Sequence, residues 1–152
     1  MTEQKQQYAY VGVDPIVLFG RLIVLAKRGP DAKTGPGVWH TPGTVVRIGQ
    51  NMESAMCSRV REKTGLVVRP LCDTMQQSFV RFYDDLQRIN EYGDIALSFL
   101  SRVVGGEMWP GEHIAEVKAF RPDELSSLHI GFDHAQILKD GIARLRDLGE
   151  ID

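Results

Sequence analysis

The segment WHTPGT at residues 39–44, followed by NMESAMCSRVREKTGL at residues 51–66, decides how this chain folds. Proline and glycine in the first segment are typical of a loop, whereas residues 52–64 contain neither. Asn51 is a residue type that caps the start of a helix, and Gly65 stands where a left-handed cap ends one. The sequence therefore predicts a loop that leads into a helix ending at Gly65.

The predicted helix carries two cations on its apolar side. At about 100° per residue its apolar residues share one arc, and Arg59 and Lys63 fall inside that arc. Since an unpaired buried charge is costly, both cations need an anion nearby, and Glu62 is placed to pair with Arg59. Three interpretations stay open: the two side chains carry their charges out to water, they form only salt bridges, or they bind an incoming phosphate.

The whole chain has the composition of one ordinary globular domain. Its 152 residues are enough for a buried core, and 43% of them are hydrophobic. The formal net charge of -2 gives no general attraction to nucleic acid or to an anionic membrane, and no apolar run is long enough to span a bilayer. Cys57 and Cys72 match neither a disulfide framework nor a metal-ligand spacing. We expect a cytoplasmic protein with a single domain at 1–152 and a flexible tail at 1–7.

The remaining pattern predicts strands that are covered by helices. Pro15 lacks a ladder donor, which suggests a bulge or a sheet edge. A helical turn is expected at 122–125, and residues 84–93 are expected to form an exposed connection. Together these features predict the α/β class, with a mixed sheet sandwiched between helices. Runs rich in Val, Ile and Leu place the strands near residues 11–19, 22–26, 66–72, 75–82, 95–104 and 117–121.

The last predicted helix is amphipathic. Asp133 and Gln136 resemble a capping box at its start, and Gly149 is expected to end it. Because these apolar residues recur at helical spacing, we expect them to cover one face of the sheet. The stripe consists of Ile137, Leu138, Ile142, Leu145 and Leu148.

The pattern around the central loop and helix resembles the Nudix box with its leader, the signature of hydrolases that act on nucleoside diphosphates linked to another group. Segments at 11–13, 103–107 and 132–134 are also similar to family members, so the resemblance covers nearly the whole chain. It implies the Nudix fold, an α/β/α sandwich with a mixed β-sheet and a central loop-helix, with the box region at 43–66. The matching residues are Gly37, Trp39, Pro42, Gly43, Gly49, Met52, Ala55, Val60, Thr64, Gly65 and Leu66.

The chain departs from the family at the positions that carry its chemistry. The family's box opens with a glycine, and this chain has Thr44 there. A glutamate–arginine pair of the family is replaced by Gln50 and Ser58. Both replacements are neutral polar residues that could still share a hydrogen bond in place of the charged pair.

The three metal-ligating glutamates of the family fall on Arg59, Glu62 and Lys63, so only Glu62 keeps a carboxylate. Magnesium takes about six oxygen ligands, usually including one or two carboxylates. One carboxylate between two cations is a poor site, because each cation repels a divalent ion. We therefore expect no metal here, or at most one held by Glu62, and loss of metal-assisted hydrolysis.

The resemblance then implies a protein that binds a nucleotide or another phosphorylated small molecule without a cofactor. Side-chain cations can replace the charge of the metal and bind phosphate oxygens directly. Neither a membrane nor a specific nucleic-acid partner is expected. The residues expected to bind the ligand are Arg59, Lys63, Arg47, Arg28, Thr44 and His40.

Two alternatives stay open. An active hydrolase would use Mg2+ or Mn2+ with Glu62 as its catalytic residue, and a non-catalytic scaffold would use the fold alone, as a homodimer. The histidines show no metal-ligand spacing, and Trp39 is expected to pack rather than to bind a base. The hydrolase would draw a general base from the acids Asp84, Asp85, Glu91 and Asp94.

Overall fold

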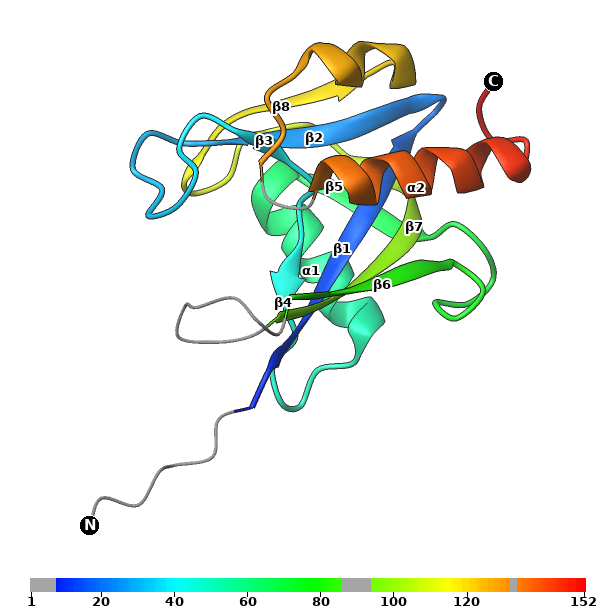
Figure 1. Cartoon of the computed structure of the whole chain (residues 1–152), viewed down its shortest axis with the longest axis horizontal. Helices are drawn as coiled ribbons and strands as arrows, with labels where there is room; N and C mark the ends of the chain where they lie inside the picture. The colour runs from blue at the N-terminus through cyan, green and yellow to red at the C-terminus, as the bar shows by residue number, and fades with distance from the viewer. Residues whose placement is uncertain (1–7, 86–93, 132–133) are drawn as a thin grey trace.

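The computed structural model describes residues 8–85, 94–131 and 134–152, and Figure 1 shows its elements along the chain. None of its helices combines the length and the apolar character needed to cross a bilayer. The helices are α1 (Met52–Thr64), the 3-10 helix η1 (Pro122–Ser127) and α2 (His134–Asp147). The strands are β1 (Tyr10–Phe19), β2 (Leu22–Arg28), β3 (Trp39–His40), β4 (Thr44–Val45), β5 (Leu66–Pro70), β6 (Phe79–Asp85), β7 (Asp94–Gly106) and β8 (Ile114–Phe120).

The strands of the described residues form one mixed sheet. Its main path runs in the order β3-β2-β1-β7-β5, and β4, β6 and β8 pair with β1, β7 and β2, respectively. β1 and β7 are parallel, with a register that runs from Tyr10–Asp94 to Leu18–Arg102. The other strand pairs are antiparallel. The two longest strands therefore lie side by side at the centre of the molecule.

The helices α1 and α2 cover opposite faces of this sheet. Ile16 and Leu18 of β1 pack in the same core cluster as the buried side chains of α2. Val13 and Val17 pack in the second cluster, with the buried side chains of α1. Since side chains of a strand alternate between the two faces, the two helices lie on opposite sides of β1, as Figure 1 also shows. The predicted α/β/α sandwich with a mixed sheet is confirmed.

Pro15 lies in a central strand, not at an edge of the sheet. One side of β1 pairs with β7, and Pro15 aligns there with Phe99. The other side pairs with β4 at Gly12 and Val13, and with β2 from Val17 onward. Pro15 falls between these two partners, where neither antiparallel ladder needs its missing N–H. Instead of the expected bulge or edge, Pro15 marks the gap between β4 and β2, the two strands that pair with this side of β1.

The position of β6 differs from the prediction. It begins at Phe79 instead of residue 75, because the preceding residues form a turn in which the Ser78 N–H donates to the Thr74 carbonyl. The Ser78 hydroxyl donates to the same carbonyl, at 2.8 Å. At its other end β6 continues to Asp85, so Asp84 lies in a strand and not in a connection.

The end of α2 also differs from the prediction. The helix ends at Asp147, and the side chain of Leu148 is 39% exposed, so Leu148 is not part of the buried stripe. The other four stripe residues are buried. The predicted cap Asp133 and the predicted tail at 1–7 lie outside the described residues, as does the segment 86–93.

Candidate functional site

A pocket of about 620 Å³ lies between α1, β1, β4 and the start of α2. Whether its side chains bind a ligand stays a prediction, but the wall contains Glu62 and all six residues that the sequence predicted to bind the ligand. These residues are Arg28, His40, Thr44, Arg47, Arg59, Glu62 and Lys63. Wall residues that the sequence did not assign to the site include Asp14, Thr41, Gly43, Ser58 and His134.

Helix α1 is fixed at both ends, which sets the position of its pocket-facing side chains. The Asn51 side chain accepts a hydrogen bond from the Ser54 N–H at 2.8 Å, and Gly65 adopts a φ of 76°, so both predicted caps are confirmed. The last carbonyls of the helix accept hydrogen bonds from the N–H groups of Trp109 and Gly111. The segment after β7 therefore closes the end of the helix that carries Lys63.

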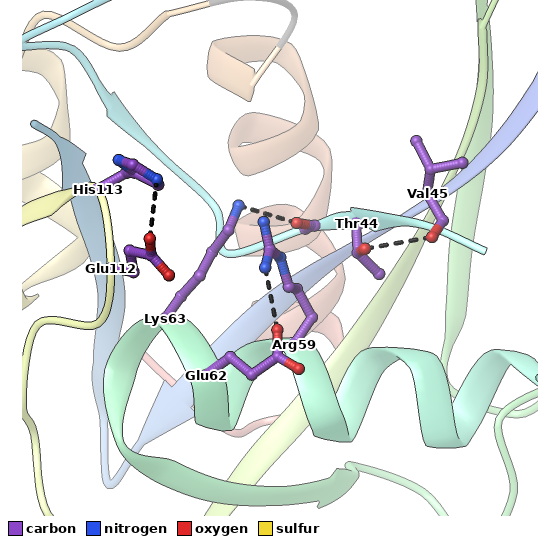
Figure 2. A network of polar contacts seen from close by, with 8 residues as sticks. Thr44, Val45, Arg59, Glu62, Lys63, Glu112 and His113 are labelled. Atoms are coloured by element: carbon purple, nitrogen blue, oxygen red, sulfur yellow. Dashed lines mark hydrogen bonds and ion pairs between the residues drawn. The ribbon is translucent and has the colours of Figure 1, made fainter. Parts of the chain in front are cut away.

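Lys63 reaches across the pocket wall to the loop before β4. Its ammonium donates to the Gly43 carbonyl at 3.0 Å, and Figure 2 shows its side chain extending alongside that of Arg59. Partial burial, together with the charges of Arg59 and Arg28, lowers the pKa of Lys63 to about 8. The carboxylates of Asp14 and Glu62 oppose this shift. The ammonium of Lys63 is therefore bonded to the pocket wall and does not extend into water, and the positive charges of Arg59 and Arg28 act on it.

Arg59 forms the salt bridge that the sequence suggested. Its Nη1 lies 3.0 Å from the Glu62 carboxylate, three residues along the helix (Figure 2). The two side chains are 42% and 63% exposed, so water screens the pair and it contributes little to stability. The Arg59 Nε is buried and has no acceptor within the described part of the chain. Arg59 thus has one paired donor, Nη1, and one donor, Nε, without an acceptor among the described residues.

The side chains of the pocket do not form a metal site like the one that the three glutamates of the family pattern would provide. Within the described ranges, no three His, Cys, Asp or Glu side chains gather closely enough to hold a metal ion. Glu62 is the one carboxylate left at the three metal-ligating positions of the family, and it is paired with Arg59. Since magnesium requires several hard oxygen ligands, this donor set does not fit the ion.

Thr41 orients two histidines at the other end of the pocket. Its carbonyl lies 2.6 Å from His40 Nδ1, and its N–H donates to His134 Nδ1 at 3.0 Å. Burial lowers the pKa of His40 to about 4 and that of His134 to about 3. Both rings are therefore neutral near pH 7. His134 Nε2 lies 3.6 Å from the Asp14 carboxylate.

Asp14 and His134 were missed because distant segments bring them to the site. Asp14 belongs to β1 and His134 opens α2, while the box residues come from one continuous segment. One signal was available for Asp14: it is a carboxylate inside an otherwise apolar strand, and its side chain is only 14% exposed. A partly buried carboxylate in such a strand is a candidate for a functional site.

The remaining sequence predictions have mixed outcomes. The Gln50 side chain accepts a hydrogen bond from the Arg47 N–H at 3.1 Å, and no hydrogen bond joins it to Ser58 among the described residues. Trp39 packs edge-on against Phe120, with ring centroids 5.0 Å apart, as expected of a packing residue. Of the acids proposed as a general base, Asp84 does not line the pocket, and the side chains of Asp85, Glu91 and Asp94 lie outside the described part of the structure.

Comparison with known proteins identifies the family. The NUDIX domain model matches residues 11–141. An ADP-ribose pyrophosphatase of Methanocaldococcus jannaschii is 31% identical over 132 residues, which cover 86% of this chain and 71% of that relative. The NUDIX domain of Shewanella oneidensis NrtR, solved with ADP ribose, is 16% identical, with a TM-score of 0.72 and coverage of 92% and 90%. An ADP-ribose pyrophosphatase from Streptococcus suis is 21% identical, with a TM-score of 0.70 and coverage of 91% and 93%. The family match spans most of the sequence, so this chain belongs to the NUDIX family.

Proposed function

We propose that this protein binds a nucleotide derivative, with ADP-ribose as the first candidate, and that binding needs no metal ion. The observation that carries the proposal is the cation cluster, defined as Arg28, Arg59 and Lys63. Lys63 is held by the Gly43 carbonyl, and the two arginines are near enough to lower its pKa. ADP-ribose is named by all three of the similar proteins described above, which makes it the natural first ligand.

The charge of the pocket favours an anion. Its wall carries two carboxylates and a larger number of cations, while the whole chain has a net charge of -2. Phosphate oxygens accept charge-assisted hydrogen bonds from lysine and arginine, and such bonds are stronger than neutral ones. A diphosphate would also reduce the mutual repulsion that lowers the pKa of Lys63. The unused Arg59 Nε supplies a donor that still needs an acceptor.

The same charges act against a divalent ion. A unit charge and a dication at about 4 Å repel each other by roughly 8 kcal/mol at an effective dielectric constant of 20. Arg59 and Lys63 both stand at positions where the family pattern has metal-ligating glutamates. We therefore propose that the positive charges of these two side chains take the place of the charge of a bound metal ion.

Calorimetric titration with ADP-ribose in the presence of a chelator tests this proposal. We expect binding that the chelator does not weaken, and a loss of at least about 1.5 kcal/mol in Arg59→Ala, the low end for a bond to a charged group. Arg61→Ala is the matched control, because Arg61 is an exposed arginine of the same helix that does not line the pocket. Equal losses in the two variants, or no binding to the wild type, would contradict the proposal.

A second candidate function is metal-dependent hydrolysis of a nucleoside diphosphate derivative. The 31% identity to an ADP-ribose pyrophosphatase favours it. Release of phosphate-containing products on addition of Mg2+ or Mn2+, and its loss in Glu62→Gln, would support this candidate over the binder. If neither binding nor turnover is found, the scaffold interpretation remains. The homodimer and the cytoplasmic location stay predictions, and light scattering in solution tests the first of them.

A further inference from the structure

The ring of His113 lies between two carboxylates, outside the pocket wall. Its Nδ1 is 2.6 Å from the Asp31 carboxylate, and its Nε2 is 3.3 Å from that of Glu112, the contact drawn in Figure 2. Carboxylate oxygens only accept hydrogen bonds, and a neutral imidazole carries one N–H. Both contacts are therefore hydrogen bonds only when the ring is protonated on both nitrogens. The hydrogen bond to His113 also holds the pKa of Asp31 below its ordinary value.

The backbone around this ion pair allows two segments to approach closely. Asp31 belongs to loop 29–37, which joins β2 to β3, and His113 directly precedes β8. The Gly29 N–H donates to the His113 carbonyl at 2.7 Å, and a methyl group on Gly29 would lie 2.8 Å from Asp31 Oδ1 and 2.9 Å from that carbonyl oxygen. His113 has a φ of 63°, a left-handed conformation that is uncommon outside glycine and persists where the surroundings hold it. We call the Asp31–His113 ion pair and the Gly29–His113 hydrogen bond the loop latch.

The loop held by this latch carries a partner of Arg28. The Arg28 Nε donates to the Thr34 carbonyl at 2.6 Å, and Nη2 donates to the Thr34 hydroxyl at 3.4 Å. Both residues line the pocket. Arg28 is the last residue of β2, and its carbonyl accepts from the Gly37 N–H at the other end of the loop. The position of the Arg28 guanidinium therefore depends on the conformation of loop 29–37.

The segment that carries His113 is itself fixed to α1. The N–H groups of Trp109 and Gly111 donate to the carbonyls of Thr64 and Lys63, at 2.8 and 3.0 Å. A methyl group on Gly111 would collide with the carbonyl oxygen of Glu62, so this contact is close. The loop latch therefore connects the loop that holds Arg28 to the helix that carries the other two members of the cation cluster.

We propose that His113 and Asp31 are positioning residues that hold loop 29–37 in place. They thereby keep Arg28 in the cation cluster, and loss of the proton from His113 releases the loop. This inference rests on the proposed function, because the cation cluster is assigned to the phosphates of the ligand. Among the described residues, the charged groups that face the ring are Asp31 and Glu112, and each has a full ion pair only with the protonated ring. Since histidine ordinarily changes its charge between about pH 5 and pH 8, affinity should fall as the pH rises through this range.

Titration with ADP-ribose at about pH 5.5 and about pH 7.5, with a chelator present, tests this inference. We expect binding about threefold weaker at the higher pH, because an exposed ion pair is worth little by itself. His113→Asn carries no charge, and asparagine accepts a left-handed backbone, so this variant should bind with the weaker affinity at both pH values. His129→Asn should keep the wild-type profile, because His129 is exposed and lies outside the pocket.

Asp31→Asn separates positioning from the bare charge of His113. This isosteric variant breaks the ion pair, keeps the histidine and removes a negative charge. If the histidine acted on the ligand by its charge alone, the variant would bind ADP-ribose at least as tightly as the wild type at about pH 5.5. The loop latch predicts binding about threefold weaker there, with no further change at about pH 7.5. Tighter or unchanged binding, or a wild-type pH profile in either variant, would overturn the latch and leave the proposed function intact.

A measurement without ligand tests the latch independently of binding. Hydrogen exchange of the Gly29 N–H, relative to the unstructured rate at the same pH, reports on its bond to the His113 carbonyl. We expect protection about threefold higher at about pH 5.5 than at about pH 7.5 in the wild type, and no such difference in Asp31→Asn. Equal wild-type protection at both pH values would overturn the latch. If protection depends on pH as expected and ADP-ribose does not bind, the latch stands and the proposed function is overturned.

Discussion

The charge on Lys63 is the single-residue property on which we expect ligand affinity to depend most directly. Its pKa is lowered to about 8, so the ammonium is charged near pH 7 and loses its proton as the pH rises further. The diphosphate of ADP-ribose stays fully ionised over this range, so a change in affinity reports on the protein. We expect affinity to fall by about tenfold or more between about pH 7 and pH 9.5, the value of one charged hydrogen bond.

The control for this pH profile is Lys63→Met. The variant should bind ADP-ribose more weakly near pH 7 and should lose most of the pH dependence, because the titrating group is gone. Titrations by calorimetry at several pH values, with a chelator present, measure both effects. A wild-type affinity that is constant across the range, or a profile that survives in Lys63→Met, would assign the phosphates to other residues.

His40 should make the protein less stable in mild acid. Its pKa is about 4 in the folded protein and about 6.5 in the unfolded chain, so the unfolded chain binds a proton between these values that the folded protein does not. Stability is therefore lost as the pH falls below about 6.5. Between pH 7 and pH 5 this residue should account for a loss of roughly 2 kcal/mol in the free energy of unfolding.

Urea unfolding at the two pH values checks this effect. In His40→Asn the loss on acidification should be smaller by that amount, while the contribution of His134, whose pKa is about 3, remains. His129→Asn should lose as much stability as the wild type, since His129 is exposed. If the three proteins respond alike, burial does not keep His40 neutral.

At the scale of elements, the glycine that ends α1 does more than permit a left-handed backbone. Gly65 and Gly49 both have positive φ, at 76° and 95°. A methyl group on Gly49 would meet no atom within 4 Å, whereas one on Gly65 would collide with the Glu107 carbonyl oxygen. Gly49→Ala should therefore cost about 1–2 kcal/mol of backbone strain. Gly65→Ala should cost at least about 1 kcal/mol more, since the segment after β7 must move.

The two glycine variants are compared by urea unfolding, and by ADP-ribose titration of each. Only Gly65→Ala should also weaken binding, because Gly65 follows directly on the turn that carries Lys63. Equal destabilisation of both variants would mean that the segment after β7 can move away from α1 without lowering the free energy of unfolding.

Elements with local signals could be predicted, and those set by tertiary contacts could not. α1 was predicted because Asn51 and Gly65 mark its ends within the sequence itself. β6 was misplaced because its start depends on the turn at Ser78, whose carbonyl accepts from Leu100 in β7. Pro15 was read as an edge because its neighbours on one side, β2 and β4, come from different parts of the chain.

At the scale of the whole molecule, the same difference between local signals and tertiary contacts explains which half of the candidate site could be predicted. The cation cluster could be assigned largely from the spacing of the box, where Arg59 and Lys63 stand one helical turn apart. The pair of Asp14 and His134 could not be predicted, because Asp14 in β1 and His134 in α2 meet only when α2 packs on the sheet. The contacts of Thr41 with the two histidines have no sequence signature at all.

The fold should accept the charges of a metal site if the two cations are exchanged for carboxylates. The core contacts and the caps of α1 do not use the side chains of Arg59 or Lys63, so the double variant R59E/K63E should keep its architecture. Together with Glu62 it would present three carboxylates on one helix, at positions 59, 62 and 63, as the family pattern has them. A bound divalent ion stabilises the folded state by about 2.7 kcal/mol at a concentration of 100 times its Kd.

We therefore expect Mn2+ to raise the thermal midpoint of R59E/K63E by several degrees and to leave that of the wild type unchanged. Binding of ADP-ribose in chelator should be lost in the same variant, because the cation cluster is gone. The control R61E/R69E makes the same change in net charge at two exposed arginines outside the pocket, and should gain no response to Mn2+. A response equal in both double variants would be nonspecific. No response in R59E/K63E would mean that residues other than these two must also change before the protein can bind a metal ion.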